Sequence, residues 1–440
     1  MTPASLPRPA LVAYGALGLP LAFAALPLYV HVPRLYAGEA GLSLAAVGAV
    51  LLAARIVDAV TDPLLGWASD RLAGRRRTIL AATVLLGASL PLLLSPPAGA
   101  GAAWLFGLLV LVSIGYSAAT IAHNAWGAEL APTPDARTRV VASREAFALA
   151  GVLLAAALPA LLAAGDGEAA GLARLGWLFL PLLVLAGAWT LRGAPPSPPR
   201  AVQRPAPLAS LAGALRDAAF VRLLAVFAVN GIAAAVPSAT VLFFVADVLR
   251  ADAQAAGLFL VLYFLAAAAS LPLWVALSRR IGKLRAWLAG MLLAVAVFAW
   301  AALLGSGELA AFAAICLLSG VALGADLSLP PSMLADLIAA PAPPARAGMR
   351  AGACFGWWSF VTKANLAIAA GTALPLLAAL GYAPGAREPA ALAALAAVYG
   401  VLPVVLKLAA ALLLWTWRAR LAPPLPIHPA AAAALREIRS

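Results

Sequence analysis

The sequence predicts an all-α integral membrane protein of about twelve helices, arranged as two six-helix halves. Of its 440 residues, 64% are hydrophobic and only 11% are charged, whereas a soluble protein carries about 25% charged residues. So few charges cannot cover a surface that faces water, and we therefore expect lipid to surround most of the chain. Twelve apolar runs, each long enough for a span of about 20 residues, are separated by polar breaks, and one long break divides them six and six.

The apolar runs give the expected membrane spans. The first run is too long for the apolar core of a signal peptide and lacks a small-residue cleavage pattern, so we expect it to be the first span. The expected spans are 9–32, 43–69, 78–96, 102–130, 142–164, 171–191, 219–248, 254–278, 285–305, 309–337, 350–381 and 391–417.

The distribution of Lys and Arg predicts the orientation of the chain. With the N-terminus in the cytoplasm, the outer loops hold only Arg34, Arg174, Arg250 and Arg387 of the 30 basic residues. Most of the others then lie on the cytoplasmic side, as the positive-inside rule requires. This asymmetry accounts for the net charge of +13, so we expect no nucleic acid as a partner and both termini in the cytoplasm.

A polar, proline-rich break from Gly193 to Asp217 marks the division between the halves. We expect a six-helix bundle over 1–192, a cytoplasmic linker over 193–217, a second bundle over 218–417 and a cytoplasmic tail over 418–440. A shift of 209 residues places Pro63 on Pro272, as a weak internal repeat would. The same shift places Ala267 and Leu271 at the positions of Asp58 and Asp62. If the repeat is real, the second half has replaced these acids by apolar residues, as a function confined to the first half predicts.

Catalytic and metal motifs are missing from the sequence. There is no phosphate-binding loop, nucleophile elbow or paired His/Glu metal motif, so we expect neither an enzyme nor a cofactor. Cys316 and Cys354 lie in apolar runs and predict neither a disulfide framework nor a metal site.

The second span carries three charged residues, Arg55, Asp58 and Asp62, which share one helical face. A charge at the centre of a bilayer costs about 2.5–3.5 kcal/mol, so such residues are usually functional. Two carboxylates one turn apart, with Thr61 beside them, suit a hard cation such as Na⁺, or they share a proton. The alternative is that Arg55 and the two acids only neutralise one another.

Three further charges lie inside expected spans. Lys363 has no acid on its own span, so we expect a partner from another helix, with Asp58 or Asp62 as the natural candidate; direct coupling and a purely structural ion pair are both open. Asp326 lies well inside the tenth span and is a candidate for lining a cavity. Lys407 is expected near the end of the last span, where its side chain can reach the interface.

Aromatic and polar side chains within the spans are candidates for contacting a solute. His123 could carry a proton, although a lone membrane histidine is more often a hydrogen-bonded core residue. Ring-stacking candidates are Tyr14, Tyr116, Trp126, Trp357 and Trp358. Tryptophan is also an ordinary packing and interface residue.

From Arg55 to Arg71 the sequence resembles the glycoside–pentoside–hexuronide:cation symporters, a family of the major facilitator superfamily. The stretch fits the pattern R-x-x-D-A-x-x-D-P-x-x-G, and Gly66 to Arg76 is similar to the superfamily's loop between helices two and three. Further similarity lies at 116–130, 137–151, 331–336 and 355–367, so the resemblance includes segments of both halves.

The resemblance implies a major facilitator fold and a role for individual residues. It implies that Asp58 and Asp62 bind the coupling cation, with Thr61 and Ser117 as further oxygen ligands. Lys363 corresponds to the family's lysine of helix eleven, and Arg144 to its helix-five arginine near the sugar. Thr120 stands where a sugar-binding aspartate is found in the family, and no acid is present between Tyr14 and Pro20. We expect Asp70, Arg71, Arg75 and Arg76 in a cytoplasmic gate.

The resemblance implies symport of a small, sugar-like or glycoside-like solute, coupled to Na⁺ or H⁺, by a monomer in a bacterial inner membrane. A lysolipid-like or other amphiphilic solute is an alternative, because the sugar-side acids are missing. A non-transporting receptor on the same fold and a proton-driven exporter are also open.

Overall fold

The computed structural model describes residues 6–38, 41–71, 74–197, 210–340 and 350–421. Its regular structure is helical throughout these ranges. The first half contains α1 (Arg8–Ala16), α2 (Gly18–Val30), α3 (Val32–Gly38), α4 (Leu44–Arg71), α5 (Arg75–Leu94), α6 (Ala102–Leu130), α7 (Pro134–Ala163) and α8 (Glu168–Gly193). The second contains α10 (Ala218–Phe243), η1 (Phe244–Val248), α11 (Ala253–Ile281), α12 (Lys283–Ala301), α13 (Leu309–Ala339), α14 (Ala351–Ala379), α15 (Pro389–Ala396), η3 (Ala397–Val401), α16 (Leu402–Thr416) and α17 (Arg418–Leu421).

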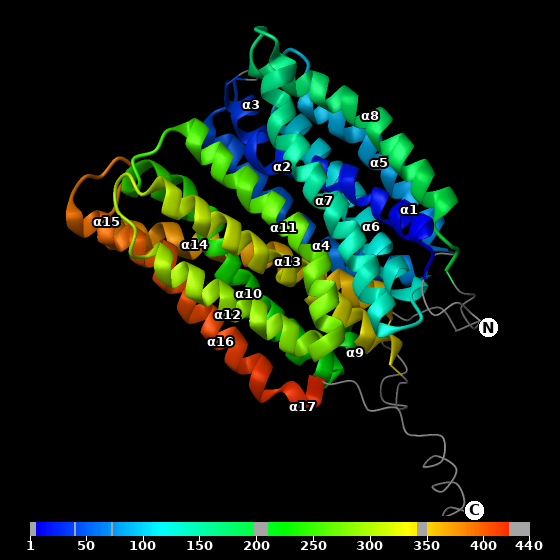
Figure 1. The fold of residues 1–440 in the computed structure, drawn as a ribbon. Helices are drawn as coiled ribbons and strands as arrows, with labels where there is room; N and C mark the ends of the chain where they lie inside the picture. The colour runs from blue at the N-terminus through cyan, green and yellow to red at the C-terminus, as the bar shows by residue number, and fades with distance from the viewer. Residues whose placement is uncertain (1–5, 39–40, 72–73, 198–209, 341–349, 422–440) are drawn as a thin grey trace, which may run out of the picture.

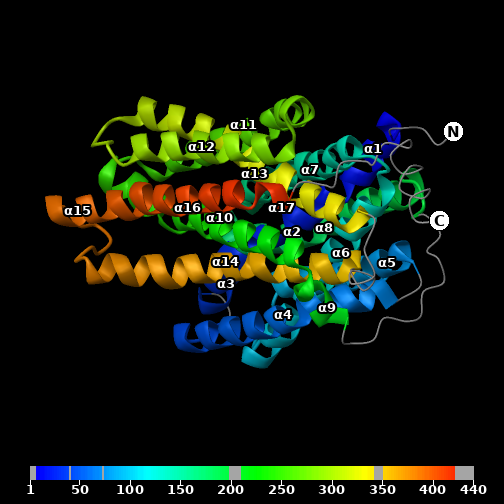
Figure 2. The same ribbon diagram turned by 90° about the horizontal axis from the view of Figure 1, so that it is seen from below.

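The two sets of helices form two bundles side by side. Helices α1 to α8, blue to green-cyan, occupy one side of Figure 1, and α10 to α17, green to red, occupy the other. A short helix, α9 (Ser210–Arg216), precedes the second bundle and contacts α4, α10 and α14. The end of the molecule where α9 lies and α1 begins is called the linker end. The opposite end, where α15 lies, is called the far end (Figure 2).

The helices have the length and composition of membrane spans. Eleven of those described are long and apolar enough to cross a bilayer, and α4 is the remaining long helix, with 28 residues that include Arg55, Asp58 and Asp62. The predicted twelve-helix architecture in two six-helix halves is therefore confirmed. The predicted first span differs in detail, because a turn at Leu17 separates α1 from α2.

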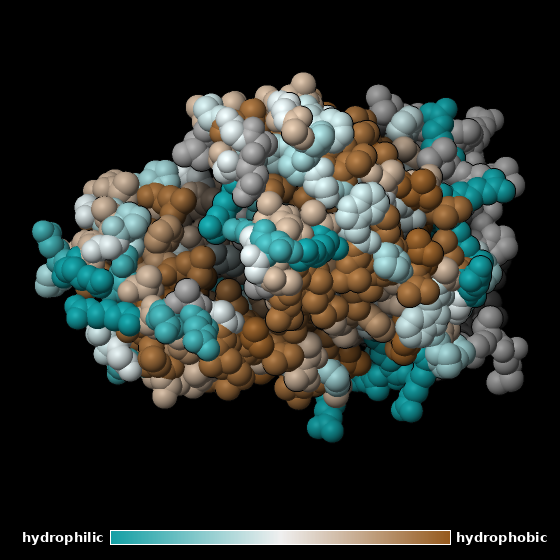
Figure 3. All heavy atoms as spheres, turned by 90° about the horizontal axis from the view of Figure 1, so that it is seen from above, coloured by the Kyte–Doolittle hydropathy of each residue, from teal (hydrophilic) through white to brown (hydrophobic). Residues whose placement is uncertain are grey.

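Large apolar side chains cover the outside of the bundle. Leu161 is 72% exposed and Leu185 is 71% exposed, and Figure 3 shows hydrophobic residues over the middle of one face with hydrophilic ones mostly near its edges. An apolar surface of this extent marks contact with lipid. The hydrophobic effect in water cannot hold such helices together, so close packing and interhelical polar contacts must do so.

The two halves approach most closely where α4 crosses α14. A Cβ atom on Gly66 would lie 2.3 Å from the carbonyl oxygen of Gly352, and one on Gly356 would lie 2.8 Å from that of Asp62. Only glycine permits this distance between backbones, as at other membrane helix crossings that use small residues four apart. The crossing places the first half of α14, from Gly352 to Lys363, against the charged face of α4.

Beyond this crossing the halves separate toward the far end. Residues 351–356 of α14 are all buried, whereas beyond Asn365 only Ala369, Ala373 and Leu377 of this helix are buried. That spacing of four is a single stripe, which faces its own half through α10. The far-end part of α14 therefore does not pack on α4, and the space between the halves widens from the crossing toward the far end.

Candidate functional site

One lysine and two aspartates meet where α4 crosses α14. Lys363 Nζ lies 2.7 Å from Asp58 Oδ1 and 2.8 Å from Asp62 Oδ1. It also donates to Ser117 Oγ of α6 at 2.7 Å. Asp58 and Asp62 are 5% and 0% exposed, and Ser117 is fully buried. The predicted pairing of Lys363 with acids of the other half is what the structure shows.

The geometry follows from helical spacing on both sides. Asp58 and Asp62 are four residues apart, so both carboxylates face α14 from successive turns of α4. On α14, Ser359 stands four residues before Lys363 and donates its hydroxyl to Asp62 Oδ2 at 2.7 Å. Ser359 was not a sequence candidate, and its spacing from Lys363 is the pattern that identifies it.

Thr61 and Arg55, which were predicted at the site, are placed differently from the prediction. Thr61 donates its hydroxyl to the backbone carbonyl of Asp58 at 3.2 Å, so Ser359 rather than Thr61 supplies the hydroxyl contact to Asp62 in this structure. Arg55 is exposed, whereas Lys363 lies on both carboxylates. Arg55 is three residues from Asp58 and one turn nearer the far end of α4, where the halves have separated.

The site contains one more negative than positive group in its fully ionised form. Two carboxylates face one ammonium, and two serine hydroxyls complete the set of polar contacts. Buried charge of this kind is costly unless it is paired. An arrangement with one unmatched carboxylate can therefore accept a single monovalent cation or a proton. Among the described residues, no group of three His, Cys, Asp or Glu side chains forms a site for a transition metal.

A second network joins the halves at the linker end. Asp70 accepts from the backbone N–H groups of Gly352 and Ala353 at 2.9 and 2.8 Å, so this residue of α4 caps the first turn of α14. Arg75 donates to Asp70 at 2.7 Å and to Glu129 of α6 at 2.7 Å. Of the predicted gate residues, Asp70 and Arg75 thus belong to one network.

The other two predicted gate residues make different contacts. The guanidinium of Arg71 lies 5.1 Å from the ring centre of Trp67 on its own helix. Arg76 donates to the carbonyl of Ala194 at 2.5 Å and lies over the ring of Trp126. Their role as gate residues stays a prediction.

Further contacts between the halves lie at the same end. Asp336 of α13 pairs with Arg137 of α7 at 3.1 Å and with Lys283 of its own half at 2.5 Å. The hydroxyls of Thr138 and Ser332 are 2.9 Å apart. Together with Asp70, these contacts close the linker end of the space between the halves.

Several predicted solute contacts are engaged in packing. Tyr14 donates to the carbonyl of His123 at 2.9 Å, and His123 Nε2 lies 2.9 Å from the carbonyl of Tyr14. Because a carbonyl only accepts, Nε2 carries the proton. Tyr14, His123 and Trp126 are at most 1% exposed, so all three are core residues here, and the core interpretation of His123 fits better than a proton carrier.

The remaining polar candidates of the first half lie nearby on α6 and α7. Arg144 donates to Asn124 of α6 and to Glu145. Thr120 Oγ1 is buried without a hydrogen-bond partner, and Tyr116 is half-buried. Tyr116 and Thr120 are close to Ser117 in the sequence of α6, and Asn124 directly follows His123.

The two predicted tryptophans of α14 have partners in the second half and the linker. Trp357 donates to the carbonyl of Leu211 in α9 at 3.1 Å. Trp358 stacks on Phe227 with 3.7 Å between the ring centres. One face of the Trp358 ring is therefore occupied by Phe227, and the hydrogen bond of Trp357 directs its indole N–H toward α9.

Asp326 and Lys407 form a buried pair, 2.5 Å apart, inside the second half. The expectation that Lys407 reaches the membrane interface is wrong, since its side chain is 5% exposed and points to α13. Asp326 faces this lysine instead of a cavity between the halves.

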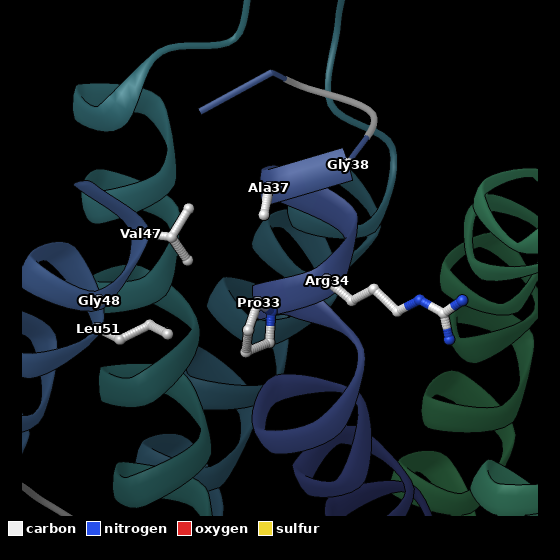
Figure 4. A pocket seen from close by; sticks show the side chains of 7 residues that line it. All are labelled: Pro33, Arg34, Ala37, Gly38, Val47, Gly48 and Leu51. Carbon is white, nitrogen blue, oxygen red and sulfur yellow. The ribbon is translucent and has the colours of Figure 1, made fainter. Parts of the chain in front are cut away.

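The structure also has an apolar pocket of about 590 Å³ between α3 and the start of α4. Figure 4 shows Val47 and Leu51 on one side of it and Pro33 and Ala37 on the other, with the side chain of Arg34 pointing away. It lies at the far end, away from Asp58 and Asp62.

Comparison with known proteins defines the class to which this chain belongs. A family described as "MFS/sugar transport protein" matches residues 11–419. The chain therefore belongs to the MFS/sugar transport protein family of the major facilitator superfamily, whose members are transporters and not enzymes. The predicted superfamily is thereby confirmed.

Individual relatives are more distant. A stretch of 140 residues is 31% identical to major facilitator superfamily domain-containing protein 12 of Equus caballus, but it spans only 28% of this chain and 28% of that protein. A crystal structure of a bacterial homologue of the iron transporter ferroportin, in an outward-facing state, superposes with a TM-score of 0.69 at 17% identity, over 94% of this chain and all of that one.

Two further solved structures share the fold. The human organic anion transporter MFSD10 has a TM-score of 0.67 and 20% identity, over 93% of this chain and 100% of that one. The E. coli fucose:proton symporter, FucP, has a TM-score of 0.65 and 14% identity, over 92% of this chain and 99% of that one. At these identities the likeness shows the major facilitator fold alone.

Proposed function

We propose that this protein is a symporter that couples the movement of Na⁺ or H⁺ to that of a small organic solute. The observation that carries the proposal is the position of Lys363, whose ammonium lies between Asp58 and Asp62 and joins the two halves. These groups are buried in the middle of membrane spans, where ionisable residues serve function by default.

Competition for the two carboxylates supplies the coupling. A cation that binds Asp58 and Asp62, with Ser117 and Ser359 as neutral oxygen ligands, competes with the ammonium of Lys363. Hard monovalent cations favour oxygen ligands of this kind. Because Lys363 belongs to the other half, its displacement changes the contact between α4 and α14, and with it the equilibrium between the two access states.

The basic residues at the linker end support an orientation of the protein in the membrane. With the basic linker end in the cytoplasm, the contacts of Asp70 and Asp336 close the cytoplasmic side, and the separated far end opens outward. The structure then corresponds to an outward-facing state, and transport proceeds by rocking of the two halves around the central site. A bacterial inner membrane is the location proposed for it.

The proposed solute is sugar-like or glycoside-like. This class rests on the match to a sugar transport family and on the resemblance of the α4 motif to the glycoside–pentoside–hexuronide:cation symporters. The fold-sharing fucose:proton symporter is a precedent for a sugar on this architecture. Polar groups available for hydroxyls include Arg144, Asn124 and the unpartnered hydroxyl of Thr120.

A lysolipid-like or other amphiphilic solute is the second candidate. The observation that favours it is the apolar pocket between α3 and α4, which opens at the far end. It also agrees with the absence of a carboxylate at Thr120, since carboxylates are strong acceptors for several hydroxyls.

The two candidates are separated by uptake into proteoliposomes. Purified protein is tested with labelled hexoses and glycosides, and with a labelled lysolipid, under inward gradients of Na⁺ or H⁺. The proposal predicts gradient-driven accumulation of one class, lost in Asp58→Asn. Accumulation of either class that is equal with and without the gradients, or unchanged in Asp58→Asn, contradicts cation coupling.

A further inference from the structure

A second lysine ammonium lies between oxygen atoms inside the C-terminal half, α10 to α17. Lys407 Nζ on α16 is 2.5 Å from Asp326 Oδ2 on α13 and 2.9 Å from Asn230 Oδ1 on α10. The other oxygen of Asp326 accepts from Trp287 Nε1 of α12 at 2.8 Å. Four helices of one bundle thus converge on a single charge pair.

This arrangement repeats the chemistry of the first site with a different charge balance. Lys363 also contacts a carboxylate and a neutral oxygen, at distances between 2.7 and 2.8 Å. It faces two carboxylates, however, and comes from the opposite half. Lys407 faces one carboxylate of its own half, so the pair is neutral and has no unmatched charge for an ion from solution.

Burial makes the ammonium necessary. Lys407 is 4% exposed, Asn230 2% and Trp287 0%, and the side chain of Asp326 itself is 12% exposed. A carboxylate in such surroundings requires a cation and hydrogen bonds to stay ionised. The indole of Trp287 supplies one hydrogen bond to Asp326, and the ammonium supplies the charge. A lysine that could instead reach the membrane surface with its flexible side chain here turns inward.

We propose that Asp326 and Asn230 form a second monovalent-cation site, in the C-terminal half, and that the tethered ammonium of Lys407 fills it permanently. The ligand class that the site takes, once the ammonium is removed, is ammonium or an alkali-metal ion. The C-terminal half then needs no ion from solution. The proposal does not depend on the coupling function proposed above.

Removal of the tethered cation tests the proposal. Full-length Lys407→Met and wild type are purified, and their melting temperatures are measured in choline, sodium, potassium and ammonium chloride at equal ionic strength. In each salt, the difference in melting temperature between the variant and wild type is compared. We expect a marked loss in choline chloride and a saturable recovery of most of it with ammonium or an alkali-metal ion. A loss that no ion reduces, or that choline reduces equally, overturns the proposal.

A double variant, Lys407→Met with Asp326→Asn, is the matched control. It removes both charges, so we expect it to be more stable in choline chloride than Lys407→Met, with no recovery by ammonium. If the double variant responds to ammonium as the single one does, Asp326 is not the ligand and the proposal fails. If Lys407→Met cannot be purified at all, a double variant that folds in choline chloride supports the proposal and one that does not overturns it.

Discussion

Lys363 Nζ lies 2.7 Å from Asp58 Oδ1, although the two residues are 305 positions apart and belong to opposite halves. The contact is made at the level where the bundle changes from closely packed to separated. Its formation and loss therefore depend on how the halves are placed, and whatever competes with Lys363 for Asp58 and Asp62 acts on that placement.

Removing the ammonium at this site should raise the apparent affinity for the coupling ion. In Lys363→Met both carboxylates lose their cation, so we expect a loss of about 3–5 kcal/mol in sodium-free buffer, as for a broken buried ion pair. Sodium or acid should then restore stability at a lower concentration than wild type requires, because no tethered competitor remains. Thermal melts across a sodium titration measure this; an unchanged midpoint in Lys363→Met would show that Lys363 and the ion do not compete.

The cap that Asp70 places on α14 should hold the linker end closed. Loss of a helix cap costs about 1 kcal/mol, which alone corresponds to roughly a fivefold shift in an equilibrium, and loss of the contact with Arg75 adds to it. Cys354 is fully buried beside this cap, so we expect Asp70→Ala to increase its rate of maleimide labelling about fivefold or more. Measurements in a Cys316→Ser background report on Cys354 alone. Equal labelling rates with and without Asp70 would argue against a closing role.

Close packing of α4 on α14 should make Gly356 intolerant of a side chain. The added Cβ of Gly356→Ala meets backbone atoms of Asp62 and Pro63 at 2.8 and 3.0 Å, and overpacking of this kind costs about 1–3 kcal/mol. Gly371→Ala on the same helix is the control, because nothing lies within 4 Å of its Cβ. We expect a lower melting temperature for Gly356→Ala only. Similar melting temperatures for both variants would mean that the crossing opens readily.

Tyr382 should stabilise the far end in a pH-dependent manner. It lies between α14 and α15 and donates to Asp247 Oδ2 at 2.5 Å. Burial, and then the carboxylate beside it, raise the pKa of Tyr382 above its ordinary value. Its contribution is therefore complete below about pH 10, the ordinary pKa of tyrosine, and is lost as the pH rises through the folded value. The difference in melting temperature between wild type and Tyr382→Phe should shrink above about pH 10; a constant difference would contradict this.

The sequence could predict the ion pairing at the site, because burying an unpaired charge in a membrane is costly. Asp58 and Asp62 share a face of one span, and Lys363 has no acid on its own span, so a pairing across helices was the expected solution. The structure shows that pairing. Gly352 and Gly356, by contrast, stand in a stretch that looks like any apolar helix, so the place where the backbones touch is visible only in three dimensions.

The residues that sequence missed lie on helices that are apolar on every side. Such a helix gives no indication of which face turns inward. Ser359 is one of the few hydroxyl side chains in α14, together with Thr362 and Thr372, and its role becomes visible only once the direction of Lys363 is known. Lys407 was assigned to the interface for the same reason, since its distance from the end of the span permits a side chain to reach water, whereas its actual direction is set by Asp326 and Asn230 on neighbouring helices.

The most direct test of the account measures the thermal stability of purified wild type and Asp62→Asn in sodium chloride and in choline chloride at several pH values. An ion that binds only the folded protein adds roughly 2.7 kcal/mol at about 100 times its Kd. The account predicts that sodium, or a lower pH if the coupling ion is a proton, stabilises the wild type, and that Asp62→Asn removes this response. If neither the ion nor the pH distinguishes wild type from Asp62→Asn, the carboxylates of α4 bind no coupling ion and the symport proposal is contradicted.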